Sequence, residues 1–100
     1  MVKKYKVLVS QKAHSDIQDT FEYIVNNLEN HQSALKLLKQ VEKAILSLEY
    51  FPNRGSRKRV SKNVGNYRYI MIDRYILVYE VKEIELQVII HTFFYSPRNI

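Results

Sequence analysis

Tyr67–Val81, YRYIMIDRYILVYEV, is the stretch that decides the fold of this chain of 100 residues. It holds two segments rich in aromatic and β-branched residues, 67–72 and 75–81, which only Asp73-Arg74 separates. Such residues favour strands, and a two-residue connection is typical of a β-hairpin, although arginine is uncommon at its second position. We therefore predict an antiparallel hairpin.

Two further strands are predicted on either side of the hairpin. Residues 82–85 form a turn and Leu86–Phe94 a final strand, which completes a three-strand meander. Near the start of the chain, apolar side chains alternate with polar ones at Tyr5, Val7 and Val9. This period of two predicts a short early strand with one buried face.

Alternation along a strand also assigns side chains to its two faces. On the first hairpin strand, one face holds Arg68, Ile70 and Ile72, and the other holds Tyr67, Tyr69 and Met71. On the final strand, we expect Ile89, His91, Phe93 and Tyr95 to lie opposite Val88, Ile90 and Thr92. The alternation does not say which face of each strand meets the helices.

Two amphipathic helices occupy the segment between the early strand and the hairpin. Ser10 caps the first, whose apolar residues recur at helical spacing: Ala13, Ile17, Phe21, Ile24 and Leu28. Asn30 caps the second, whose apolar residues are Ala34, Leu37, Leu38, Val41, Ala44, Ile45 and Leu48. Phe51-Pro52 ends it, because proline disfavours helical geometry in the residue before it. The short link predicts an antiparallel helix pair.

The order strand, helix, helix and three-strand meander predicts an α+β fold. The helix pair packs on one face of a small, mainly antiparallel sheet, and the other face stays open. We expect a single domain over 1–100. The chain has no cysteine, which excludes disulfides and thiolate chemistry. Neither a signal-peptide pattern nor an apolar run of membrane-spanning length is present, so we expect a cytoplasmic protein.

All of the net charge of +6 is concentrated in residues 50–72. This window has no acidic residue, and its cations are Arg54, Arg57, Lys58, Arg59, Lys62 and Arg68. Much of it is a loop of about fifteen residues, longer than most connections in compact domains. A cationic loop leading to the open face of a sheet suggests a site for a polyanion, whereas a solvated surface loop is the alternative.

Arg68, His91 and Tyr95 are the candidates for chemistry. A strand position would fix the Arg68 guanidinium for bidentate binding of a phosphate; a structural pair with Glu80 is the alternative. His91 could act as acid or base, or could be a half-buried structural histidine. Tyr95 could stack on a base or exchange protons. His14 and His31, at the predicted helix starts, have no expected role.

Several catalytic patterns are absent from the sequence. It contains no glycine-rich phosphate loop, no GxSxG elbow and no His, Cys or Asp spacing suited to a metal. We therefore expect no cofactor and no metal. A phosphodiester cut by such a chain would be that of RNA, whose 2′-hydroxyl supplies an internal nucleophile.

The order of elements and several local strings resemble the RelE/ParE superfamily of type II toxin–antitoxin toxins over essentially the whole chain. The strings are Ala13–Ile17, Ala44–Pro52, Asn66–Arg68, Arg74–Val81, Val88–His91 and Tyr95–Asn99. The Asn66–Arg68 and Arg74–Val81 strings, on the paired strands, are the most specific part. The tail resembles the plasmid-stabilisation branch, whose members are often named ParE.

The resemblance implies a small toxin that a cognate antitoxin, acidic or amphipathic, neutralises by wrapping around it. RelE-like members cut mRNA on the ribosome, whereas ParE-like members bind DNA gyrase. Arg68 matches the second-strand arginine of the RelE branch. His91 stands where many RelE-like members have arginine, and the loop lacks the glutamate that YoeB-like members use as base.

We predict a ribosome-dependent mRNA endonuclease in which Arg68, His91 and Tyr95 are catalytic. The expected RNA-binding residues are Arg54, Arg57, Lys58, Arg59, Lys62 and Arg98. The alternatives are a gyrase inhibitor that binds protein and has no active site of its own, and a nucleic-acid-binding module without toxicity.

Overall fold

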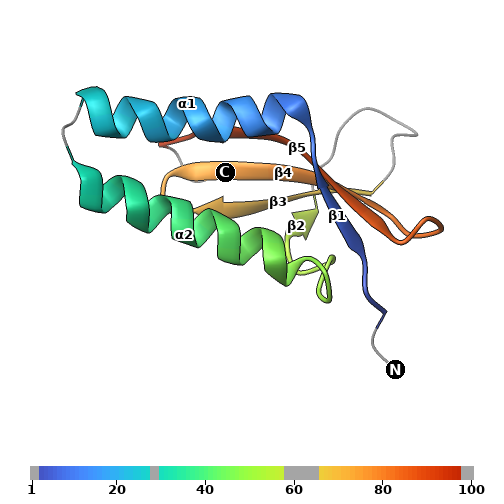
Figure 1. The fold of residues 1–100 in the computed structure, drawn as a ribbon. Coiled ribbons are helices and arrows are strands. Elements are labelled where there is room, and N and C mark those ends of the chain that lie inside the picture. Colours follow the sequence, from blue (N-terminus) through green and yellow to red (C-terminus); the bar gives the residue numbers. More distant parts are fainter. Residues whose placement is uncertain (1–2, 28–29, 58–65, 98–100) are drawn as a thin grey trace.

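The computed structural model describes residues 3–27, 30–57 and 66–97, and these form two helices and a five-stranded sheet. In chain order the elements are β1 (Lys6–Val9), α1 (Gln11–Asn27), α2 (His31–Ser47), β2 (Ser56–Arg57), β3 (Asn66–Ile72), β4 (Tyr75–Lys82) and β5 (Gln87–Tyr95). The helices lie side by side on one face of the sheet (Figure 1). The predicted α+β fold is confirmed.

The sheet has the strand order β1-β5-β4-β3-β2. β1 pairs with β5 in parallel, and the other neighbours are antiparallel. The predicted hairpin is present, because Ile72 pairs with Tyr75 across the Asp73-Arg74 turn. Asp73 takes a φ of 56°, a left-handed conformation that aspartate tolerates better than most residues.

One strand was not predicted. β2 lies where the sequence indicated only a loop, and its two residues pair with Tyr69 and Arg68 of β3. A strand of two residues is too short to show alternation. The final strand was predicted to end one residue too early, at Phe94, since Tyr95 ends β5.

Both predicted helix caps are confirmed. The Ser10 hydroxyl accepts a hydrogen bond from the Ala13 N–H at 3.0 Å. The Asn30 side chain accepts one from the Ser33 N–H at the same distance. These bonds satisfy amide groups that a helix start leaves without a partner.

The core lies between the helices and the covered face of the sheet. The buried helix residues include Ala13, Ile24, Ala34, Leu37, Val41 and Ala44, and Leu48 is buried directly after α2 ends. The sheet contributes Ile70, Ile72, Leu77, Tyr79, Val81, Val88, Ile90 and Phe93. On β3 this is the face that Arg68 shares with Ile70 and Ile72, so the helices cover the Arg68 side of the strand.

A β-bulge changes the faces of β5. Val78 pairs with Thr92 but Tyr79 pairs with Ile90, so His91 is the extra residue. Phe93, opposite Leu77, is therefore buried on the same side as Ile90. The prediction that His91 and Phe93 share a face is wrong, because strict alternation does not hold across a bulge.

Asp16 of α1 binds the C-terminal part of β5, beyond the residues of β5 that pair with β1. The register of β1 ends at Val9 opposite Ile90, and Asp16 accepts hydrogen bonds from groups beyond that point. They are the Thr92 hydroxyl at 2.7 Å and the Phe93 N–H at 3.2 Å. Lys12 is a third donor at 3.0 Å. Burial alone would raise the pKa of Asp16, but these donors together lower it.

The lowered pKa of Asp16 predicts a loss of stability in acid. A carboxyl whose pKa is lower in the folded state stabilises the fold above its unfolded pKa of about 3.9, and this contribution disappears as the pH falls through the folded value. At pH 6, Asp16→Asn should lower the free energy of unfolding by at least about 1 kcal/mol. Urea titrations between pH 2 and 6 measure it.

Asp73→Asn, at an exposed carboxylate in a turn that asparagine tolerates, is the matched control and should change stability little. The difference between wild type and Asp16→Asn should shrink toward pH 2. An equal difference at pH 2 and pH 6 would rule out the charge of Asp16 as its source.

Candidate functional site

Arg68 contacts the turn that connects α2 to β2. Its Nη1 donates hydrogen bonds to the carbonyl oxygens of Asn53 at 3.2 Å and Gly55 at 2.9 Å. The side chain is half-buried on the helix-covered side of the sheet, where Arg68 pairs with Tyr79 of β4. The guanidinium therefore donates hydrogen bonds to backbone carbonyls in this structure.

Tyr79 of β4 binds the same turn from the core side. Its side chain is fully buried, and its hydroxyl donates to the Pro52 carbonyl at 2.7 Å and accepts from the Gly55 N–H at 3.0 Å. Burial raises the pKa of Tyr79, although the Gly55 N–H and the Arg68 and Arg54 charges act in the opposite direction. The hydroxyl thus stays protonated and able to donate.

Glycine is required at position 55 because the chain passes so close to the sheet. A Cβ atom there would lie 2.6 Å from both the Tyr69 carbonyl oxygen and the Tyr79 hydroxyl oxygen. We call the segment Pro52–Gly55 the anchored turn. Tyr79 and Arg68 together bind the carbonyls of three of its residues and one of its amides.

The alternative pairing of Arg68 with Glu80 is wrong. Neighbouring positions on β4 face opposite ways, so Glu80 lies on the open face while Arg68 lies under the helices. The expectation that the cations lie beside the open face also fails for Arg68. The sequence grouped its side chain correctly with Ile70 and Ile72 but could not say which group is covered.

His91 lies in a cluster on the open face. Its Nε2 is 2.9 Å from Oε1 of Glu80, and its ring centroid is 5.3 Å from that of Tyr67. Burial raises the pKa of the Tyr67 hydroxyl, and the Glu80 carboxylate adds to the effect. A carboxylate that orients an imidazole is an arrangement used in acid–base chemistry and also in structural pairs. Strand propensities alone did not reveal this partnership, because it depends on the bulge.

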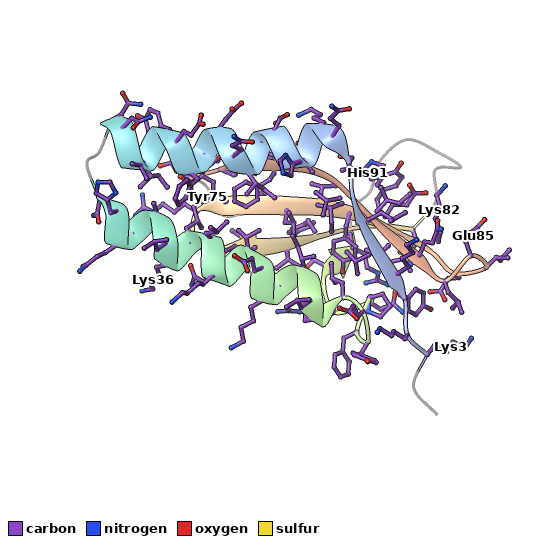
Figure 2. All side chains as sticks on the ribbon, in the orientation of Figure 1. Lys3, Lys36, Tyr75, Lys82, Glu85 and His91 are labelled. Atoms are coloured by element: carbon purple, nitrogen blue, oxygen red, sulfur yellow. The ribbon has the colours of Figure 1, made fainter. Side chains whose placement is uncertain are left out.

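Tyr95 lies far from His91 on the same strand. It pairs with Tyr75, and the two rings meet edge to face with centroids 5.4 Å apart. Tyr75 and His91 lie toward opposite ends of the sheet (Figure 2). Tyr95 is four positions after His91 along the strand, about 13 Å at the usual rise.

The three predicted catalytic residues therefore do not meet. Arg68 and His91 lie on opposite faces of the sheet, and Tyr95 lies at the end of β5. Within residues 3–27, 30–57 and 66–97, no group of three or more His, Asp or Glu side chains could hold a metal ion. In the same ranges, neither helix has the length and apolar character to cross a membrane.

Of the predicted RNA-binding cations, Arg54 and the backbone of Arg57 lie in the described part of the chain. Arg54 is exposed, and its Nη1 donates to the Ser47 hydroxyl at 2.7 Å near the end of α2. The backbone of Arg57 pairs with Arg68 in the sheet. The Arg57 side chain and the residues Lys58, Arg59, Lys62 and Arg98 lie outside the described part of the chain.

Comparisons with known proteins bear on this arrangement. The model of a family described as the ParE toxin of the type II toxin–antitoxin system parDE matches residues 7–93. The resemblance seen in the sequence is thereby confirmed. No match is found among curated protein sequences.

Solved structures share the fold at low sequence identity. A chain of the chromosomal ParDE system of P. aeruginosa has a TM-score of 0.72 and 19% identity, and the alignment covers 93% of this chain and 97% of that one. A chain of the RelBE2 toxin–antitoxin complex of Mycobacterium tuberculosis has a TM-score of 0.66 and 16% identity, and the alignment covers 98% of each chain. YoeB from Staphylococcus aureus has a TM-score of 0.58 and 18% identity, and the alignment covers 93% of this chain and 98% of that one.

The anchored turn predicts a large cost for Tyr79→Phe. The change leaves the Pro52 carbonyl and the Gly55 N–H without the hydroxyl, and an unsatisfied buried group costs about 1–3 kcal/mol. Denaturant unfolding should show a loss in this range. Tyr50→Phe, at an exposed tyrosine, is the matched control and should stay within about 0.5 kcal/mol of wild type. Equal stabilities of the two variants would refute the anchoring role.

Proposed function

Since this chain belongs to the ParE toxin family of type II toxin–antitoxin systems, we propose that it arrests growth by binding a protein target, DNA gyrase. This is the function that the ParE branch of the resemblance implies. It requires a binding surface and no catalytic residues of the chain's own. The position of Arg68 supports it best.

Arg68 was the residue expected to hold the scissile phosphate of mRNA. Its Nη1 instead donates to the carbonyls of Asn53 and Gly55, on the side of the sheet that the helices cover. Nη1 is committed to these carbonyls, and Nε is buried without a hydrogen-bond partner, so a phosphate would have to reach the guanidinium on the helix-covered side of the sheet. This favours a structural role for the residue over a catalytic one.

The spacing of the other candidates agrees with this reading. Cleavage of a phosphodiester needs the phosphate-binding group and the acid or base within reach of one reacting centre. Arg68 and His91 point to opposite faces, and Tyr95 lies along β5 at the far end from His91. A protein-binding mode of action requires no such convergence.

Ribosome-dependent mRNA cleavage is the second candidate, and the His91 cluster favours it. His91 and Glu80 lie 2.9 Å apart on the open face beside Tyr67, so an oriented imidazole is available there. In this alternative, cations from the window 50–72 other than Arg68 would hold the RNA.

An antitoxin is the proposed partner in either case. The structural neighbours from P. aeruginosa and M. tuberculosis come from toxin–antitoxin systems. The net charge of +6 would attract an acidic segment and speed its association. An acidic or amphipathic antitoxin is therefore expected to cover part of this surface and neutralise the toxin.

His91→Ala separates the two candidates. Expression of the chain without a partner should arrest bacterial growth and trap gyrase–DNA complexes, and His91→Ala should still do both, because binding of a protein target needs no acid or base from the imidazole. Gyrase–DNA complexes and ribosome-dependent mRNA ends are measured in the same cultures.

His14→Ala, at an exposed histidine of α1, is the matched control, and circular dichroism verifies that both variants fold. Cleaved mRNA in the wild type that disappears in His91→Ala but not in His14→Ala would overturn the gyrase proposal in favour of the nuclease. Intact mRNA together with undisturbed gyrase would overturn both.

A further inference from the structure

A pocket with aromatic walls lies between α1 and the end of the sheet. It is lined by Asp19, Thr20 and Tyr23 of α1 together with Tyr75 of β4 and Tyr95 of β5, and its volume is about 540 Å³. Tyr75 marks its position in Figure 2, away from His91. The volume is in the range of small-ligand sites.

The rings of the pocket are held in place from the core. Tyr75 stacks on buried Phe93 with centroids 5.2 Å apart and an angle of 9°, and it meets Tyr95 edge to face. Tyr23 and Tyr95 are each 56% exposed. The pocket therefore presents a fixed inner ring between two rings that solvent reaches.

The charged side chain that lines the pocket in the described part of the chain is acidic, whereas the adjoining β3–β4 turn carries both Asp73 and Arg74. Asp19 lines it, and Asp73 in the β3–β4 turn lies near enough to Tyr75 to affect it. Burial raises the pKa of Tyr75, and Tyr95, Asp73 and Tyr23 add to this effect. Within the described part of the chain, no lysine or arginine lines the pocket.

We propose that this pocket binds the guanidinium group of an arginine side chain on the antitoxin. Aromatic faces attract cations through their quadrupole, and a planar guanidinium can stack on a tyrosine while it pairs with a carboxylate. Asp19 supplies that carboxylate, and Tyr23, Tyr75 and Tyr95 supply the rings.

Charge complementarity selects this occupant. The net charge of +6 is concentrated in residues 50–72, of which none that the structure describes lines the pocket, so Asp19 sets the charge of the lining and favours a cationic occupant such as arginine. An otherwise acidic segment that carries one arginine would fix its register on the toxin in this way. The identity of the polypeptide rests on the antitoxin partner proposed above, whereas the preference for a guanidinium rests on the pocket alone.

The test is an NMR titration of the full chain with two capped tripeptides, acetyl-Gly-Arg-Gly-amide and its neutral analogue acetyl-Gly-citrulline-Gly-amide. The arginine peptide should shift the ring resonances of Tyr23, Tyr75 and Tyr95 along a saturable curve. The citrulline peptide, which has the same shape without the charge, should give a dissociation constant at least fivefold higher.

Asp19→Asn should weaken binding of the arginine peptide at least fivefold. Glu22→Gln is the matched control, because this exposed carboxylate of α1 does not line the pocket, and it should change binding less than twofold. Equal binding of the two peptides, undiminished binding by a folded Asp19→Asn, or no saturable shift in the wild type would each overturn the proposal. Growth arrest and gyrase trapping do not enter this experiment, so its failure is distinct from failure of the proposed function.

Discussion

The capture of the anchored turn by Tyr79 and Arg68 is the interaction on which the rest of the structure depends. The turn passes from the end of α2 to the edge of the sheet, and it brings backbone polar groups against the core. Buried carbonyls and amides must find partners. A fully buried tyrosine hydroxyl and the Nη1 of an arginine provide them from two paired strands. Gly55 allows the close approach that both contacts need.

This constraint divides the functional surfaces of the molecule. Arg68 is bound to the turn on the helix-covered side of the sheet. His91, Glu80 and Tyr67 lie on the open face, and the tyrosines around Tyr75 lie at the end of the sheet. A toxin that works by contact can use these surfaces separately. A nuclease would need to reunite them around one phosphate, and the sheet itself stands between Arg68 and His91.

Much of the fold could be predicted because its signals are local. Aromatic and β-branched residues on both sides of Asp73-Arg74 predicted the hairpin, and Ser10 and Asn30 marked the helix starts. The site was harder for physical reasons. Alternation pairs Arg68 with Ile70 but leaves two equivalent orientations of the strand, and only packing of the helices selects one. The bulge at His91 has no sequence signal here, and it decides that the imidazole meets Glu80.

The unfolding free energy of Arg68→Met tests the structural role of Arg68 most directly. Methionine keeps much of the apolar stem and removes the donors to Asn53 and Gly55. If Arg68 holds the turn, the variant should lose about 1–3 kcal/mol of stability in denaturant unfolding. A variant as stable as the wild type would contradict this role, and would return Arg68 to the residues available for binding a phosphate.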